Sequence, residues 1–264
     1  HVGGAEANVA SALSRFGHMT RMVSAVPENA FGAKTIAELK SRDINCDQVK
    51  HGPGRLGFYF LETGAVQRPS SILYDRAHST FSQVEPDQYD WDAIFDGAAV
   101  LHLSGITPAV SAKCAEAAWD GVAEAARRGI QVSFDGNYRR ALWAEWSGDG
   151  PQILRRLIEH SSIAFINEKD LGLIFQTEFE TRQQAIDFAF DTFPNLKTIA
   201  ATRRAQSSVA VQTLRGELYQ RNRIWTSRLH QMDGVIDRIG GGDAFAAGVL
   251  SALISGDDPQ TIVD

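Results

Sequence analysis

The sequence predicts an α/β fold in which a mostly parallel sheet carries helices on both faces and a small β flap is added to it. Short apolar segments alternate with amphipathic segments of helical spacing along most of the chain. Residues 54–79 differ, because two β segments follow each other there without a helix-length connection. Ligands of parallel sheets bind at the carboxyl ends of the strands, so we expect the functional site at that edge.

The expected elements begin with a helix over residues 5–16, where Val9, Leu13 and Phe16 repeat at helical spacing. The flap should pair Leu56–Leu61 with Ser71–Tyr74 in antiparallel fashion. The remaining elements are expected as a strand near Met22–Val26, a helix at Ala30–Arg42, a strand at Val100–Leu103, a helix at Ser111–Arg128, strands at Ile130–Phe134 and Ile163–Ile166, a helix from near Glu168, a strand at Leu196–Ala201, a hairpin of Val209–Gln212 with Glu217–Gln220 around Arg215-Gly216, and a helix from Gly242.

Composition places the chain among globular proteins. It has 264 residues, a formal net charge of −6, 44% hydrophobic and 22% charged residues. The acidic balance argues against nucleic acid as a partner, and charge interrupts every apolar stretch before it could span a membrane. Cys46 and Cys114 lie far apart, which argues against a disulfide framework or zinc site and favours the cytoplasm. We expect one domain over residues 1–264, cut at both ends, because the chain begins without Met and ends in a helix-like segment.

The sharpest local signal is a glycine run that leads into a helix. Gly240, Gly241 and Gly242 allow several backbone N–H groups to converge at a helix N-terminus, which makes an anion hole. Asp243 follows, where a carboxylate could take a proton from a hydroxyl that attacks a phosphoryl group. The alternative is a flexible loop with an N-capping Asp. Neither a P-loop nor a G-x-G-x-x-G motif is present.

Two segments stand out at opposite ends of the chain, Gly3–Ala10 and Asp237–Gly248. Both resemble the signatures of the PfkB (ribokinase-like) carbohydrate kinases. The resemblance implies a ribokinase-like fold with a Rossmann-type sheet and a β lid at about 54–79, with ATP and Mg²⁺ used for in-line transfer to a sugar hydroxyl. It implies that Asp243 is the catalytic base, that Gly240, Gly241 and Gly242 form the anion hole, and that Gly3, Gly4 and Asn8 bind substrate hydroxyls. It also implies a missing strand before His1, hence an exposed sheet position and an open adenine site.

The resemblance suggests metal ligands at Asn167-Glu168-Lys169-Asp170, which matches the family's N-E-x-E except for the last residue. Asn167, Glu168 and Asp170 would serve Mg²⁺, or the two acids are simply first-turn helix acids. Asp237 would help to hold a monovalent cation such as K⁺.

The nucleotide segment departs from the family's glycine-containing pattern, since Thr202–Ser208 stands in its place. We expect nucleotide contacts from Thr202, Arg203, Arg204 and Ser207. The two arginines either meet phosphate through their guanidinium forks or are solvated surface charges. Asn137 and Arg139 follow a strand directly and are expected beside the nucleotide as well.

Charge in the sugar site suggests the acceptor. Tyr74 and Arg76 share a strand face, and Tyr59 could join them from the partner segment. Arg76 and Arg139 converging on a small sugar favour a carboxylate, which Arg binds bidentately. This set resembles the 2-keto-3-deoxygluconate kinase branch of the family. Alternatively the tyrosines only pack across the strands and Arg76 is a charged flap edge.

Three functions remain open from the sequence. The first is an ATP-dependent kinase that phosphorylates the terminal hydroxyl of 2-keto-3-deoxygluconate. The second is a kinase for a neutral ketose such as fructose, and the third is a catalytically silent sugar- or nucleotide-binding protein. A two-stranded flap is marginal alone, so a homodimer through the lid is expected. His102 is expected to be a near-core histidine rather than a ligand.

Overall fold

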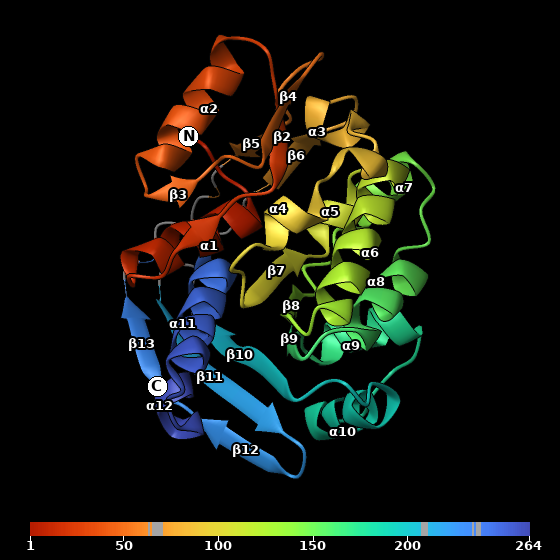
Figure 1. Cartoon of the computed structure of the whole chain (residues 1–264). Helices are drawn as coiled ribbons and strands as arrows, with labels where there is room; N and C mark the ends of the chain where they lie inside the picture. The colour runs from red at the N-terminus through yellow and green to blue at the C-terminus, as the bar shows by residue number, and fades with distance from the viewer. Residues whose placement is uncertain (63, 65–70, 207–210, 234, 236–238) are drawn as a thin grey trace.

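A seven-stranded sheet lies at the centre of the chain in this computed structural model, which describes residues 1–62, 64, 71–206, 211–233, 235 and 239–264 (Figure 1). The strand order is β12-β11-β10-β9-β8-β7, and β13 pairs with β11. Strands β7 to β10 are parallel neighbours, whereas β11 runs against β10, β12 and β13. The strands are β7 (Val100–Ser104), β8 (Gln131–Asp135), β9 (Ile163–Phe165), β10 (Thr198–Gln206), β11 (Val211–Gln220), β12 (Arg223–Thr226) and β13 (His230–Asp233). The predicted, mostly parallel sheet is confirmed.

Two hydrophobic cores lie on opposite faces of this sheet, because side chains alternate along each strand. On β9, Ile163 and Phe165 pack into the core formed with α1, α11 and α12, while Ala164 packs into the larger core beneath α6, α8, α9 and α10. The helices are α1 (Ala5–Arg15), α2 (Ala30–Lys40), α3 (Thr80–Gln83), α4 (Trp91–Phe95), α5 (Ile106–Ala109), α6 (Ala112–Arg127), α7 (Arg140–Glu145), α8 (Gly150–Glu159), α9 (Glu168–Phe175), α10 (Arg182–Thr192), α11 (Gly241–Ser255) and α12 (Pro259–Val263), with a 3₁₀ turn at Pro86–Gln88.

Short strand pairs build the N-terminal part of the molecule. β1 (Thr20–Arg21) pairs with β3 (Ile44–Asn45), and β2 (Ser24–Pro27) pairs with β4 (Val49–Gly52), both in parallel. The strand expected near Met22–Val26 therefore begins two residues later than predicted.

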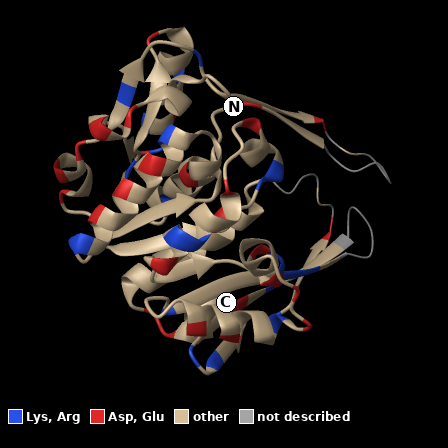
Figure 2. Ribbon diagram, turned by 90° about the vertical axis from the view of Figure 1, so that its right-hand side faces the viewer, with Lys and Arg blue, Asp and Glu red and all other residues tan. Residues whose placement is uncertain are grey.

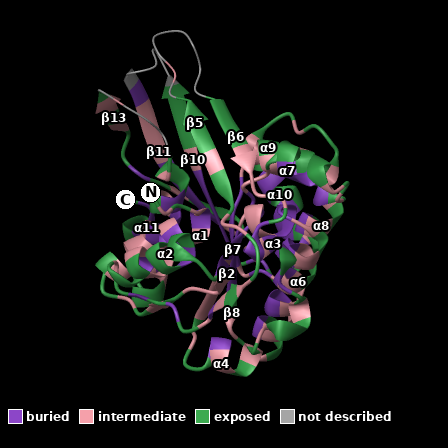
Figure 3. Cartoon of the chain, turned by 90° about the horizontal axis from the view of Figure 1, so that it is seen from above, coloured by how far each residue is buried: buried purple, intermediate pink, exposed green. Residues whose placement is uncertain are grey.

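The predicted lid is present as an antiparallel pair. β5 (Phe58–Glu62) pairs with β6 (Ser71–Asp75) so that Tyr59 lies opposite Tyr74. Figure 3 shows β5 and β6 extending from the same side of the molecule as the carboxyl end of β10 and the amino end of β11. The lid is thus placed over the edge of the sheet where the site was expected.

The hairpin predicted around Arg215-Gly216 is wrong. β11 runs unbroken through both residues and pairs with β10 from Ile199↔Tyr219 to Gln206↔Gln212. Gly216 does not form a turn but allows Phe245 and Val263 to pack closely against β11. A Cβ at this position would lie 3.1 Å from the ring of Phe245 and 3.1 Å from the Val263 carbonyl oxygen. The segment that contains Thr202, Arg203 and Arg204 consequently belongs to a strand.

Charged residues of both signs are interspersed along the described ribbon (Figure 2). Within the described ranges, every helix is too short or too polar to span a bilayer. Cys46 and Cys114 are both buried free thiols.

Candidate functional site

The two signature segments meet in space although they lie at opposite ends of the sequence. Asn8, on α1, donates from Nδ2 to Oδ2 of Asp243, on α11, over 2.7 Å. Asp243 is only 8% exposed. The hydrogen bond fixes the orientation of the carboxylate, which the local sequence alone could not have specified.

The glycine run shapes the start of α11. Gly240 is the N-cap residue with φ 75°, a left-handed conformation that favours glycine, and its carbonyl accepts from the Ala244 N–H over 2.8 Å. The helix begins at Gly241, one residue earlier than predicted. The space where a Cβ of Gly242 would lie is open. The first N–H groups of α11 are therefore accessible to an anion beside Asp243.

Burial raises the pKa of the Asp243 carboxyl above its ordinary value. The Asn8 hydrogen bond opposes this shift, the Glu6 carboxylate adds to it, and the positive charge of Arg139 again opposes it. A carboxylate with a raised pKa is a stronger base than a free aspartate, which suits it to accept a proton.

The inner face of the lid meets the N-terminus of α1. The Tyr59 hydroxyl lies 3.2 Å from the position that a Cβ of Gly3 would occupy, and Gly4 is the N-cap residue of α1. The Arg76 guanidinium lies 5.1 Å from the ring centre of Tyr74 and 5.9 Å from that of Tyr59. The structure therefore brings the predicted sugar-site residues together.

Arg76 and Arg139 are close enough to influence each other. Burial lowers the pKa of Arg76, the Tyr74, Glu6 and Tyr59 groups oppose the shift, and Arg139 adds to it by repulsion. Arg139 is exposed at the N-cap of α7 and donates to the Tyr138 carbonyl oxygen over 3.1 Å. An anion between the two guanidinium groups would relieve this repulsion.

A positive φ of 34° at Asn137 produces the turn after β8 that leads to Arg139. Asn137 is half-buried there. The structure thus places Asn137 at the carboxyl edge of the sheet, as expected.

Two acidic residues of this region were missed as site residues from the sequence. Asp135 ends β8, and burial together with the carboxylates of Asp170, Asp243 and Glu6 raises its pKa to about 8. Its position directly after an apolar strand was the available signal. Glu6 Oε1 accepts from the Ser104 N–H over 3.0 Å, as well as from the hydroxyls of Ser104 and Thr107. No local sequence pattern predicts these hydrogen bonds of Glu6, because Ser104 and Thr107 lie far from it in the sequence.

The predicted metal motif forms the first turn of α9. Asn167 Oδ1 accepts from the N–H groups of Lys169 and Asp170, and Asp170 Oδ2 accepts from the Asn167 N–H over 3.0 Å, which is a capping box. Burial raises the Asp170 pKa, the Asn167 backbone and Arg139 oppose this, and Glu168 adds to it. Glu168 and Asp170 are thus acids of the first turn of α9, and one Asp170 oxygen caps the helix while the second is left for other contacts. A metal role for this motif stays a prediction.

Adjacent arginines on β10 have different surroundings. Arg203 Nε donates to Glu217 Oε1 over 2.8 Å, within a network in which Arg182 joins Glu217 to Glu168. Arg204 Nη2 instead lies 3.8 Å from the position of a Cβ on Gly241. Arg204 is thus the arginine beside the anion hole.

The remaining predicted residues lie within the sheet, beside the core or outside the described residues. Thr202 pairs with Gly216 within the sheet. Ser207 and Asp237 lie outside the described residues. His102 is a near-core histidine, as expected: its ring packs edge-on against Phe165, Nδ1 lies 2.9 Å from Ser133 Oγ, and burial lowers its pKa to about 4.

Comparison with known proteins identifies the family. The family model described as "pfkB family carbohydrate kinase" matches residues 1–264. The chain belongs to the PfkB family of carbohydrate kinases.

Relatives of this PfkB kinase include 2-dehydro-3-deoxygalactonokinase of Haloferax volcanii, which is 30% identical over 98% of this chain and 77% of its own length. The crystal structure of 2-dehydro-3-deoxygluconokinase from Thermotoga maritima is 31% identical with a TM-score of 0.92, covering 99% of this chain and 81% of that one. Probable fructokinase-6 of Arabidopsis thaliana is 26% identical over 95% of this chain and 62% of its own. The ribokinase-like fold and the activity of a phosphotransferase acting on a sugar hydroxyl are thereby established.

Among its described residues, the PfkB kinase holds no group of three or more His, Cys, Asp or Glu arranged to bind a metal. Asp135 and Asp170 are nevertheless close enough to raise the Asp135 pKa. Two neighbouring carboxylates suit Mg²⁺, which keeps several waters and takes phosphate oxygens as further ligands. Glu168 is less available, because its Oε2 accepts from Arg182 Nε over 2.6 Å.

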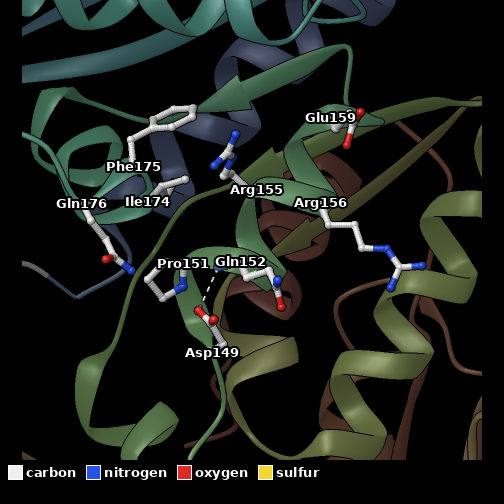
Figure 4. A pocket seen from close by; sticks show the side chains of 9 residues that line it. All are labelled: Asp149, Pro151, Gln152, Arg155, Arg156, Glu159, Ile174, Phe175 and Gln176. Atoms are coloured by element: carbon white, nitrogen blue, oxygen red, sulfur yellow. Dashed lines mark hydrogen bonds between the residues drawn. The ribbon is translucent and has the colours of Figure 1, made fainter.

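A separate hollow of about 520 Å³ lies on the outer surface of the PfkB kinase between α8 and α9 (Figure 4). Asp149, Gln152, Arg155 and Phe175 are among its lining residues, and Arg155 lies over the Phe175 ring at 5.0 Å. It shares no residue with the sugar and glycine-loop groups described above, so we place the chemistry elsewhere.

Proposed function

We propose that this PfkB kinase is an ATP-dependent sugar-acid kinase that phosphorylates 2-keto-3-deoxygluconate at its terminal hydroxyl, giving 2-keto-3-deoxy-6-phosphogluconate. The observation that carries the proposal is the position of the Arg76 guanidinium over the rings of Tyr59 and Tyr74, with Tyr59 beside Gly3. The charge of Arg139 acts on the same guanidinium. A neutral sugar would bring no opposite charge to these two cations, whereas a carboxylate accepts hydrogen bonds from both. The names of the gluconokinase and galactonokinase relatives support the same class of substrate.

The sugar acid would lie between the lid and the N-terminus of α1. Arg76 and Arg139 hold its carboxylate, and Tyr59 and Tyr74 flank it from β5 and β6. The sugar hydroxyls bind to Gly3, Gly4 and Asn8. The terminal hydroxyl then points to Asp243, to which Asn8 is already hydrogen-bonded.

The transfer proceeds from the groups at the start of α11. Asp243 takes the proton of the terminal hydroxyl while that oxygen attacks the γ-phosphorus of ATP. The bond to the β,γ-bridging oxygen breaks and ADP leaves. The N–H groups at Gly240, Gly241 and Gly242 stabilise the negative charge on the transferring phosphoryl group.

Arg204 is proposed to bind the phosphates of ATP, because it lies beside Gly241. Thr202, Ser207 and Asn137 complete the nucleotide contacts in this proposal. Arg204→Ala is expected to raise the KM for ATP while the KM for sugar changes little. Arg203→Ala is the matched comparison, because the Arg203 guanidinium donates a hydrogen bond to Glu217. Equal ATP KM values for both variants would contradict the assignment.

Mg²⁺ fits this site as the ion of MgATP rather than as an ion caged by protein. When bound, it neutralises charge on the phosphates. Asp170 and Asp135 are the residues proposed to hold it or its waters, with Asn167 and Glu168 nearby on the first turn of α9. A role for Asp237 with K⁺ stays a prediction.

A coupled ADP-release assay on the purified protein tests the function. The panel contains 2-keto-3-deoxygluconate, 2-keto-3-deoxygalactonate, fructose and ribose, each with saturating MgATP. We expect the highest kcat/KM with a keto-deoxy sugar acid. A clear preference for fructose would refute the proposal and favour a neutral-sugar kinase, in line with the fructokinase relatives.

The outer face of the lid supports a further proposal, a homodimer through β5 and β6. Phe60 and Leu73 lie opposite each other and are 57% and 67% exposed, and Phe58 packs edge-to-face on Phe31 of α2. A second copy would cover this apolar strip. Light scattering should report a dimer that Phe60→Ser dissociates, whereas Leu229→Ser, also an exposed leucine, should not. A monomeric wild-type protein would refute it.

A further inference from the structure

A salt bridge lies at the root of the lid, where the chain enters β5 and leaves β6. Arg55 Nη1 donates to Asp75 Oδ2 over 2.8 Å, and Arg55 Nη2 donates to Asp75 Oδ1. Arg55 Nη2 also donates to the carbonyl oxygens of Asp75 and Ala77, each over 3.1 Å. One guanidinium therefore holds both the side chain and the backbone of the returning strand. We refer to the Arg55–Asp75 pair as the lid clamp.

The clamp residue Asp75 stands between two residues of the sugar site. Tyr74 and Arg76 flank it in sequence, and Arg76 lies over the rings of Tyr74 and Tyr59. Asp75 is directed to Arg55 instead. Alternation along the strand thus separates a clamp side from a substrate side.

The clamp can control the register of the lid, that is, which residues of β5 and β6 lie opposite each other. β5 and β6 form a two-stranded sheet, and two strands alone are marginally stable. A slip of one residue in such a sheet would move every side chain to the opposite face. Tyr74 would then leave the face of the lid that it shares with Tyr59, which contacts Gly3, and Arg76 would leave the sugar.

We propose that Arg55 and Asp75 are positioning residues that hold the register of β6 and thereby keep Tyr74 and Arg76 on the sugar. The part of this inference that concerns the acid group rests on the proposed function. The clamp itself acts on whichever sugar the kinase phosphorylates. Neither Arg55 nor Asp75 contacts the glycine run or Asp243 in this arrangement, so the effect should be confined to sugar binding.

The exposure of the two clamp side chains argues that the pair positions the lid rather than stabilises the whole protein. The side chains of Arg55 and Asp75 are 38% and 47% exposed. Exposed ion pairs contribute little to the stability of a whole protein. A purely structural pair would therefore leave both stability and kinetics nearly unchanged when it is broken, whereas the clamp should change sugar kinetics selectively.

The test uses the full chain and the best substrate of the wild-type enzyme. Asp75→Asn keeps the shape of the side chain and removes its charge, Arg55→Ala removes the whole fork, and Arg55→Lys keeps the charge without the fork. Arg127→Ala is the matched control, because Arg127 makes a bidentate pair with Glu124 on the exposed surface of α6. Initial rates give KM for sugar and for ATP, and thermal unfolding reports stability.

For Asp75→Asn and Arg55→Ala we expect kcat/KM for the sugar to fall by about tenfold to a hundredfold, mainly through KM, with the KM for ATP unchanged. Arg55→Lys should recover part of the loss, and Arg127→Ala should match the wild type. Amide hydrogen exchange should become faster in residues 58–62 and 71–75 while β7 to β10 keep their protection.

An unchanged sugar KM in Asp75→Asn and Arg55→Lys, or an equal rise in both KM values, would overturn the clamp. If Arg55→Ala fails to fold, those two conservative variants decide. Failure of the proposed function looks different, because it is seen in the wild type alone as a preference for a neutral sugar. In that case the variants are scored on that neutral sugar.

Discussion

Replacing Arg76 with Ala removes the group on which the acid assignment depends most. Arg76 is half-buried against the rings of Tyr59 and Tyr74, so water screens its contact with a carboxylate only partly. A bidentate contact comprises two hydrogen bonds to a charged group, each contributing about 1.5–3 kcal/mol. Loss of both at the lower limit would cost about 3 kcal/mol.

Arg139 reduces that loss. It stays in the site and can keep one end of the carboxylate, and the removal of Arg76 also ends the repulsion between the two cations. We therefore expect a net loss of about 2–3 kcal/mol, which is a fall of about 30- to 150-fold in kcat/KM for 2-keto-3-deoxygluconate. The effect should fall mainly on KM, because the carboxylate is remote from the transferring phosphoryl group.

The coupled ADP-release assay measures this directly, with fructose as a second substrate in the same preparation. Activity on fructose, however low, should change little, since fructose has no carboxylate. Arg155→Ala is a matched control, because Arg155 also lies over an aromatic ring, that of Phe175, but in the separate hollow (Figure 4). A change below about threefold for the sugar acid would refute the reasoning.

Three further predictions follow from the site and the sheet. Asp243→Asn should lower kcat by about 10²- to 10⁴-fold with little change in the KM for ATP, whereas the exposed Asp257→Asn should be neutral; near-wild-type turnover would remove Asp243 as the base. Burial raises the Asp135 pKa from 3.8 to about 8, so its contribution to stability is present below about pH 4 and is lost as the pH rises towards 8. Asp135→Asn should therefore unfold at an increasingly higher temperature than the wild type between those pH values, and identical midpoints at pH 8 would contradict this. Gly216→Val should destabilise the fold by about 1–3 kcal/mol in urea titration because of its contacts with Phe245 and Val263, and an unchanged midpoint would show that the helices can move apart.

Most of the secondary structure could be predicted from local patterns. Helix α1 is found at Ala5–Arg15 and α6 at Ala112–Arg127, close to the predicted ranges, because their apolar spacing and flanking residues are local properties. The hairpin around Gly216 failed for the opposite reason. A glycine between two β segments suggests a turn, and only the approach of Phe245 and Val263 shows that it serves packing.

The candidate site divides in the same way. The residue types of Gly240, Asp243 and Arg76 already suggested an anion hole, a base and an anion-binding group. The groups around these residues could not be predicted from the sequence. They include the hydrogen bond from Asn8 to Asp243 and the carboxylates near Asp135. Nor could the sequence show that Arg203 contacts Glu217 while Arg204 lies beside the glycine run.

The sequence by itself therefore determined the α/β class and the lid, and it suggested the chemistry that we propose for the glycine run and its aspartate, because spacing, turn residues and side-chain type act over a few residues. Only the tertiary structure decided which groups lie beside each of the charged side chains. Contacts such as that of Asn8 with Asp243 join residues from opposite ends of the chain. Their energies depend on distance and burial, and neither quantity exists until the chain has folded.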